Sequence, residues 1–190
     1  MTVIMGYMGA NNYYIASDNE VTDSGDPVAI GEAQAKIHDF GEFLIGGTGK
    51  YKSNQALEKW KPPKRNSKET LHDYIKNKVV PALEKRLMEF KVMGEVNKIP
   101  DFDETCTKFL IVCKEGIYLV GHDMCCVKLK DRYHAIGCGG DIALGALGLS
   151  YLHYFSCGER QILRAACDLA AKHCNGVNDD FQVIERNYRS

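Results

Sequence analysis

The order of the predicted secondary-structure elements is the feature that most constrains the fold of this chain. Short apolar runs typical of strands come in two groups, each group is followed by helical segments, and a last strand closes the chain. The predicted strands cover 2–8, 13–17, 36–39, 43–45, 109–113, 117–120, 125–129, 133–136 and 181–185, and the predicted helices cover 50–60, 66–91, 140–154 and 159–174. Strand runs followed by helix runs favour an α+β fold over alternating βαβ units. The simplest packing stacks two sheets with helices on the outside.

Capping residues and breakers set the predicted ends of these elements. Asn66 with Glu69, and Ser156 with Glu159, each have the spacing of a capping box at a helix start. Pro81 inside the segment 66–91 predicts a kink or a break, because proline lacks the backbone N–H that a helix interior needs. The polar, glycine-containing stretch 19–35 is predicted to be a long connection.

Length, charge and composition exclude several classes of protein. A chain of 190 residues is predicted to form a single domain, 1–190. Its 24 basic residues against 25 acidic ones give no electrostatic reason to expect a nucleic-acid or anionic-membrane partner. Neither a membrane-length apolar run nor a positively charged signal region is apparent. We therefore expect a cytoplasmic protein whose eight cysteines are reduced thiols.

Phosphate-binding and metal-binding motifs fail at fixed positions. Gly46–Lys50 follows a strand and precedes a helix, but Leu44 and Tyr51 replace the Gly and the Ser or Thr that a P-loop needs. Structural zinc needs two close pairs of ligands, and only Cys125 and Cys126 are close, with side chains on opposite faces of a strand. We expect neither a cofactor nor a metal.

The beginning of the chain carries the pattern that does indicate chemistry. Thr2 is followed directly by an apolar strand, and removal of Met1 would give Thr2 a free α-amino group beside its own hydroxyl. The next strand ends at Asp18, and Lys36 is the first basic residue of the chain. A lysine flanked by apolar residues on a strand needs a carboxylate partner if it is buried.

These segments resemble the β-type subunits of the proteasome and the bacterial heat-shock-locus peptidase, which are N-terminal nucleophile hydrolases. The matching segments, in the family's order, are T-V-I-M-G at 2–6, I-A-S-D at 15–18, A-K-I-H at 35–38, I-G-G-T-G at 45–49 and A-I-G-C-G-G at 135–140. The segment 167–176 is similar to the family's fourth helix. The resemblance implies a four-layer αββα sandwich, two antiparallel sheets flanked by helices.

The resemblance also implies catalytic roles. Thr2 matches the nucleophile, Asp18 the acid and Lys36 the lysine of the family, and Gly47 matches the glycine whose backbone N–H forms the oxyanion hole. A threonine hydroxyl needs a base, and an α-amino group with a pKa of about 7.7–8.0 is close enough to neutrality to act as one. A cationic Lys36 nearby would lower that pKa further.

Departures from the family pattern leave alternatives open. Cys138 stands where the family usually has serine, Lys172 where it often has aspartate, and Asn175 near a second family serine. The first interpretation is a threonine-type peptidase that works on peptides or unfolded proteins in a homo-oligomeric ring, with an ATP-dependent unfoldase as a partner. The alternatives are a catalytically silent ring-forming scaffold of the same fold and a small-molecule amidohydrolase.

Overall fold

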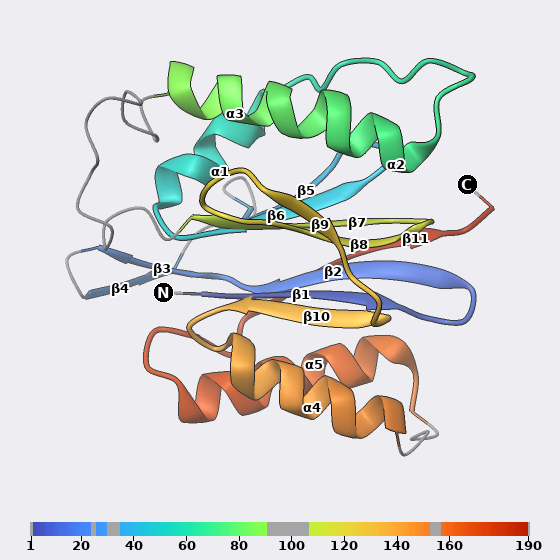
Figure 1. Cartoon of the computed structure of the whole chain (residues 1–190). Helices are drawn as coiled ribbons and strands as arrows, with labels where there is room; N and C mark the ends of the chain where they lie inside the picture. Colours follow the sequence, from blue (N-terminus) through green and yellow to red (C-terminus); the bar gives the residue numbers. More distant parts are fainter. Residues whose placement is uncertain (1, 24–25, 30–34, 91–106, 153–156, 190) are drawn as a thin grey trace.

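Two antiparallel sheets stack face to face between two layers of helices (Figure 1). The computed structural model describes residues 2–23, 26–29, 35–90, 107–152 and 157–189. The first sheet has the strand order β10 (Tyr133–Gly137), β1 (Val3–Met8), β2 (Asn12–Asp18), β11 (Phe181–Asn187). The second sheet has the order β5 (Ile37–Asp39), β6 (Leu44–Thr48), β7 (Lys108–Cys113), β8 (Gly116–Val120), β9 (Cys126–Lys128). The predicted α+β class and four-layer αββα sandwich are confirmed.

The stretch 19–35 is not only a connection, as the sequence suggested. It contains β3 (Glu20–Asp23) and β4 (Asp26–Ala29), which pair antiparallel as a small ribbon beside the sandwich. The prediction failed because the segment is polar and lacks the alternation of apolar and polar residues that marks a half-buried strand. This ribbon begins two residues after Asp18, at the end of β2 that carries Asp18.

The first helical layer is more interrupted than the sequence predicted. After α1 (Tyr51–Glu58), the predicted helix 66–91 begins only at α2 (Leu71–Tyr74), passes through the π-helical turn η2 (Ile75–Val79) and ends as α3 (Val80–Glu89). Thr70, not Asn66, is the N-cap, because its hydroxyl accepts a hydrogen bond from the backbone N–H of Asp73 at 3.1 Å. Pro81 is the second residue of α3 and follows closely on the π-helical turn, within a helical run that continues from α2.

The second helical layer consists of α4 (Gly140–Leu152) and α5 (Glu159–His173). The end of the predicted helix 140–154 and the predicted cap Ser156 lie outside the described residues. The N-cap of α5 is Gly158, which has no side chain to cap with, and Glu159 instead accepts a hydrogen bond from the backbone N–H of Ala10 at 3.2 Å. This contact ties the start of α5 to the turn between β1 and β2.

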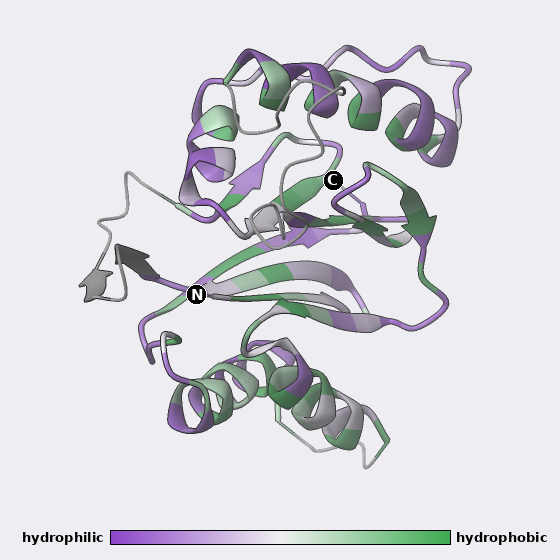
Figure 2. Ribbon diagram, turned by 60° about the vertical axis from the view of Figure 1, so that its left-hand side comes forward, coloured by the Kyte–Doolittle hydropathy of each residue, from purple (hydrophilic) through white to green (hydrophobic). Residues whose placement is uncertain are grey.

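Apolar side chains fill the three spaces between the four layers. The strands β1 and β7 consist mostly of apolar residues. The helix α4 is apolar around much of its surface, as its hydropathy colours show (Figure 2). One cluster packs α1–α3 on the second sheet, one packs α4 and α5 on the first sheet, and one lies between the sheets around Ile4, Ile15, Leu44 and Leu110. Full burial of each such side chain stabilises the fold by about 1.5–3 kcal/mol. Every residue of β1 is buried, so β1 is held rigidly at the centre.

Candidate active site

Thr2 and Asp18 meet because β1 and β2 are paired neighbours. Their register sets Ile4 opposite Ser17, which brings Asp18 beside the start of β1. One carboxylate oxygen of Asp18, Oδ1, accepts a hydrogen bond from the backbone N–H of Val3 at 2.9 Å and another from Thr2 Oγ1 at 3.0 Å. Thr2 and Asp18 are buried, with 7% and 0% of their surfaces exposed. The hydroxyl of Thr2 is therefore held in one orientation.

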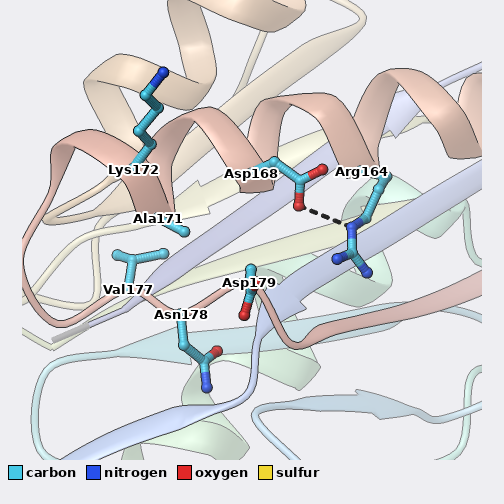
Figure 3. A pocket seen from close by; sticks show the side chains of 7 residues that line it. All are labelled: Arg164, Asp168, Ala171, Lys172, Val177, Asn178 and Asp179. Atoms are coloured by element: carbon cyan, nitrogen blue, oxygen red, sulfur yellow. Dashed lines mark hydrogen bonds and ion pairs between the residues drawn. The ribbon is translucent and has the colours of Figure 1, made fainter.

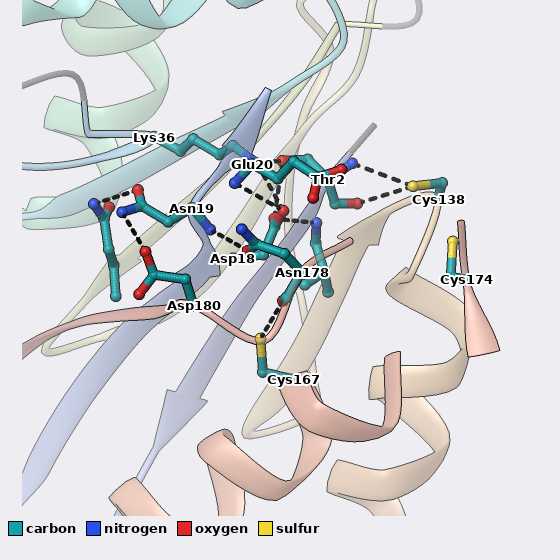
Figure 4. Close-up of polar contacts among 12 residues, drawn as sticks. Thr2, Asp18, Asn19, Glu20, Lys36, Cys138, Cys167, Cys174, Asn178 and Asp180 are labelled. Carbon is teal, nitrogen blue, oxygen red and sulfur yellow. Dashed lines mark hydrogen bonds and ion pairs between the residues drawn. The ribbon is translucent and has the colours of Figure 1, made fainter. Parts of the chain in front are cut away.

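Lys36 reaches the same point from the second sheet. It lies one residue before β5, so the predicted strand 36–39 begins one residue later in the structure. Its ammonium donates to Asp18 Oδ2 at 2.9 Å and to Thr2 Oγ1 (Figure 4). Only 2% of Lys36 is exposed. Burial lowers the pKa of Lys36, while the negative charge of Asp18 opposes that shift. The ion pair with Asp18 thus favours the charged form of a lysine that has almost no contact with solvent.

Gly47 lies in β6 at the position opposite Lys36. The register of β5 and β6 pairs Ile37 with Gly46, so the next pair along the two chains is Lys36 and Gly47. The carbonyl of Gly47 accepts a hydrogen bond from Asn54 Nδ2 of α1 at 3.2 Å. A side chain at Gly47 would meet Phe109 at 2.7 Å and Asn54 at 2.9 Å, so the packing excludes one.

Cys138 contacts the backbone of Thr2 on both sides. Its thiol accepts a hydrogen bond from the Thr2 N–H at 3.2 Å and donates to the Thr2 carbonyl at 3.4 Å (Figure 4). The Gly139 N–H also donates to that carbonyl, at 3.4 Å. Gly137 has φ +98°, and a Cβ there would lie 2.2 Å from the Thr2 carbonyl oxygen, so this turn needs glycine. Asp18, Lys36 and Cys138 thus all contact Thr2, while Gly47 lies across the strand pair from Lys36.

The sequence did not reveal that the segment after α5 holds Asn19, the residue next to Asp18, through hydrogen bonds. The backbone N–H of Asn19 donates to Asn178 Oδ1 at 3.1 Å, and the Asn19 amide donates to Asp180 Oδ2 at 3.1 Å. Gln182 donates to Asn19 Oδ1 at 2.6 Å. These bonds hold the residue after Asp18 against the start of β11. No sequence motif marks Asn178 or Asp180, because their role depends only on the pairing of β11 with β2.

Cys174 is a second residue that the sequence analysis left without a role. It follows the last turn of α5, and Figure 4 shows its thiol on the side of Cys138. Burial, and next the neighbouring Cys138 thiol, raise the pKa of Cys174 to about 11. Lys172 and Asn175, the other departures from the family pattern, are exposed.

A separate pocket of about 490 Å³ lies between α5 and the segment 177–179 that follows it (Figure 3). It is lined by Arg164, Asp168, Ala171, Lys172, Val177, Asn178 and Asp179. Arg164 and Asp168 form an ion pair of 2.8 Å across one turn of the helix. Asn178, which also bonds to the backbone of Asn19, lines this pocket, but Thr2 does not.

The described residues contain no cluster of three or more His, Cys, Asp or Glu side chains that could hold a metal ion. In the same part of the chain, no helix combines the length and apolar character needed to cross a membrane.

Comparison with known proteins identifies the fold. No protein-family model and no curated protein sequence matches the chain. Among solved structures, Thiobacillus denitrificans BPH matches with a TM-score of 0.76 and 18% identity over 98% of both chains. The same protein in complex with epoxomicin matches with a TM-score of 0.75 and 18% identity, again over 98% of both chains. Eukaryotic HslV from Trypanosoma brucei matches with a TM-score of 0.65 and 16% identity over 97% of this chain and 99% of that chain.

The chain therefore shares its fold with Thiobacillus denitrificans BPH and with HslV from Trypanosoma brucei. Identities of 16–18% support a shared fold and leave the activity to be argued from the site itself.

Proposed function

We propose that this chain is a threonine-type peptidase that hydrolyses amide bonds after removal of Met1, with Thr2 as the nucleophile. The observation that carries the proposal is the position of the buried Lys36 ammonium, which contacts both the Thr2 hydroxyl and Asp18. A buried lysine that only stabilised the fold would need its carboxylate and nothing more. Here it also contacts the hydroxyl of Thr2, whose own backbone nitrogen becomes a free amine when Met1 is removed.

The chemistry follows from this arrangement. A freed α-amino group of Thr2 takes the hydroxyl proton as Oγ1 attacks the substrate carbonyl, and the positive charge of Lys36 keeps that amine neutral and able to accept a proton. The developing oxyanion accepts a hydrogen bond from the Gly47 N–H, a contribution of about 3–4 kcal/mol at comparable sites. The amine then protonates the leaving group. A water molecule hydrolyses the ester on Thr2 and restores the hydroxyl.

One observation favours a second candidate, a silent scaffold of the same fold. The nitrogen of Thr2 donates to a thiol, Cys138 Sγ, and a thiol is a weaker hydrogen-bonding group than the hydroxyl that the family pattern has there. The surroundings of the amine are therefore less polar than the resemblance alone implies. A scaffold would keep the Lys36–Asp18 pair for stability and have no turnover.

We infer a cytoplasmic peptidase of peptides or unfolded proteins, assembled as a homo-oligomeric ring and supplied by an ATP-dependent unfoldase. The complex of Thiobacillus denitrificans BPH with epoxomicin supplies a probe, since an epoxyketone reacts with a terminal threonine through both its hydroxyl and its amine. The exposed apolar side chains of α4 support self-association.

The test compares chains that differ only at the amine and the hydroxyl. Protein whose intact mass shows a start at Thr2 is assayed on short fluorogenic peptides and with epoxomicin, beside the same protein with Met1 attached. We expect turnover and an adduct only in the first. Thr2→Ala should lose about a thousandfold or more in kcat, and Thr2→Ser should retain part of it.

Cys138→Ala is the matched control for an alternative nucleophile, and circular dichroism confirms that each variant is folded. Activity that survives in Thr2→Ala would exclude the threonine mechanism. Failure of epoxomicin to react with protein that starts at Thr2 would exclude it too and favour the scaffold.

A further inference from the structure

We propose that Cys138 and Cys174 form a reversible disulfide on exposure to a hydroperoxide, and that this bond disables the Thr2 site. The disulfide itself follows from the position of the two thiols. Its effect on turnover rests on the proposed function above.

The backbone around the two cysteines places them together. The loop that carries Cys138 packs on the last turns of α5: a Cβ at Gly139 would lie 3.1 Å from the Ala170 Cβ and 3.0 Å from a methyl group of Val177. Cys174 lies one helical turn after Ala170, whose carbonyl accepts a hydrogen bond from the Cys174 N–H at 2.8 Å. Residues four apart share one face of a helix, so Cys174 continues the surface on which the Cys138 loop rests.

Both thiols lie on the same side of the contact between the Cys138 loop and the end of α5. Figure 4 shows the sulfur of Cys174 directed toward Cys138, and the Cys138 thiol contributes to the raised pKa of Cys174. Cys138 is exposed and Cys174 is half-buried, so a small peroxide reaches the first more readily than the second. Cys113 and Cys167, in contrast, are fully buried and packed as small apolar side chains.

The chemistry balances with a hydroperoxide as the oxidant. The sulfur of Cys138, as its thiolate, attacks the peroxide; the O–O bond breaks, and a sulfenic acid and one water or alcohol form. The thiol of Cys174 then loses its proton and attacks the Cys138 sulfur, which expels the hydroxyl as water and forms the S–S bond. Two thiols are oxidised by two electrons and one peroxide is reduced. A dithiol reductant reverses the reaction.

Bond formation would change the contacts of Thr2. The Cys138 sulfur now accepts from the Thr2 nitrogen at 3.2 Å and donates to the Thr2 carbonyl at 3.4 Å. A disulfide removes the S–H donor and turns the Cys138 sulfur toward Cys174, because its geometry is fixed by the two Cβ atoms. The nitrogen that the proposed mechanism uses as a base thereby loses its present partner.

The test uses the full chain, reduced and then treated with hydrogen peroxide. Peptide mapping by mass spectrometry should locate a Cys138–Cys174 bond in the wild type, and dithiothreitol should remove it. Cys174→Ser should instead accumulate a sulfenic acid at Cys138 that dimedone traps. Cys125→Ser, which removes an exposed thiol elsewhere in the fold, is the matched control and should behave like the wild type.

The two proposals can fail separately. A bond that joins other cysteines, or a stable sulfenic acid in the wild type, would overturn the disulfide, whatever the activity. On protein that starts at Thr2, peptidase turnover should fall at least tenfold on oxidation and recover on reduction, while Cys174→Ser should not show this reversible cycle. A disulfide that forms without any loss of turnover would overturn the inhibitory role. A disulfide that forms in a protein with no turnover when reduced would contradict only the peptidase proposal.

Discussion

Lys36 Nζ lies 2.9 Å from Asp18 Oδ2, and the two side chains are 2% and 0% exposed. Lys36 comes from the second sheet and Asp18 from the end of β2 in the first, so this ion pair crosses the space between the two sheets. Desolvation of two charges is costly, and their mutual attraction and the added hydrogen bonds to Thr2 and to the backbone N–H groups of Val3 and Glu20 offset it.

Removal of one charge of this pair should destabilise the fold. Asp18→Asn leaves a buried ammonium without its carboxylate, and we expect a loss of about 3–5 kcal/mol in the free energy of unfolding, measured by urea denaturation. The double variant Asp18→Asn/Lys36→Met removes both charges and should recover most of that loss. If the double variant is as unstable as the single one, the charge pair is not the cause.

Gly47 should tolerate no side chain, in contrast to a glycine of α4. Gly47→Ala would set a Cβ 2.7 Å from Phe109, and we expect a loss of about 1–3 kcal/mol in stability together with the loss of any peptidase turnover. Gly145→Ala is the control, since nothing lies within 4 Å of its Cβ and alanine favours the helix by about 0.5–1 kcal/mol. Equal effects at the two positions would argue against the packing described for β6.

The stability of the protein should fall on mild acidification because of His38. Burial lowers the pKa of His38 to about 4, below the 6.5 of the unfolded chain. Between these two pH values His38 binds a proton in the unfolded state but not in the folded state. The free energy of unfolding therefore decreases as the pH falls from about 6.5 toward 4. Burial also lowers the pKa of His134, which adds to the same slope.

His38→Phe should flatten this dependence in urea denaturation series between pH 4 and pH 7. Phenylalanine keeps the stacking on Phe40 and removes a buried ring nitrogen, Nε2, that has no hydrogen-bond partner among the described residues. An unchanged slope in this variant would assign the pH dependence to other groups.

The first helical layer should respond to Thr70 more than to Asn66. Thr70→Ala removes the side chain that caps α2, at a cost of about 1 kcal/mol, whereas Asn66→Ala should cost only a few tenths. Thermal unfolding of the two variants distinguishes them. A larger effect at Asn66 would restore the capping box that the sequence suggested.

Self-association should depend on α4. Leu149 and Leu152 are 54% and 72% exposed, which is unusual for two leucines on one helix of a protein with well-filled cores. Light scattering at micromolar concentration should give a multiple of 21.2 kDa. The double variant Leu149→Lys/Leu152→Lys should lower that mass, and Lys85→Glu on α3, at the opposite face, should leave it unchanged. A strictly monomeric wild type would exclude a ring and favour the small-molecule amidohydrolase.

The fold could be predicted from element order because periodicity and turn residues reveal which segments are strands and helices. The contacts of Lys36 and Asp18 could be anticipated too, since a lysine in an apolar strand needs a carboxylate. Cys174 and Asn178 could not, because the approach of the segment after α5 to Thr2 depends on how α5 packs on the first sheet. The start of the helix after α1 could not be predicted either, because Thr70 and Asn66 are both good capping residues. The packing of Leu71 and Tyr74 into the core selects Thr70.

The register of β11 has a practical consequence for handling the protein. Phe181 pairs with Asp18 and Asn187 with Asn12, so the chain leaves β11 at the end of the sheet farthest from Thr2 (Figure 1). An affinity tag or a fluorescent label attached after residue 190 would therefore extend away from the site. The same tag placed before Thr2 would be joined to the first buried strand at the very atom that the proposed chemistry requires. The two ends of this chain are not equivalent for fusion, and only the carboxyl end is suited to immobilisation.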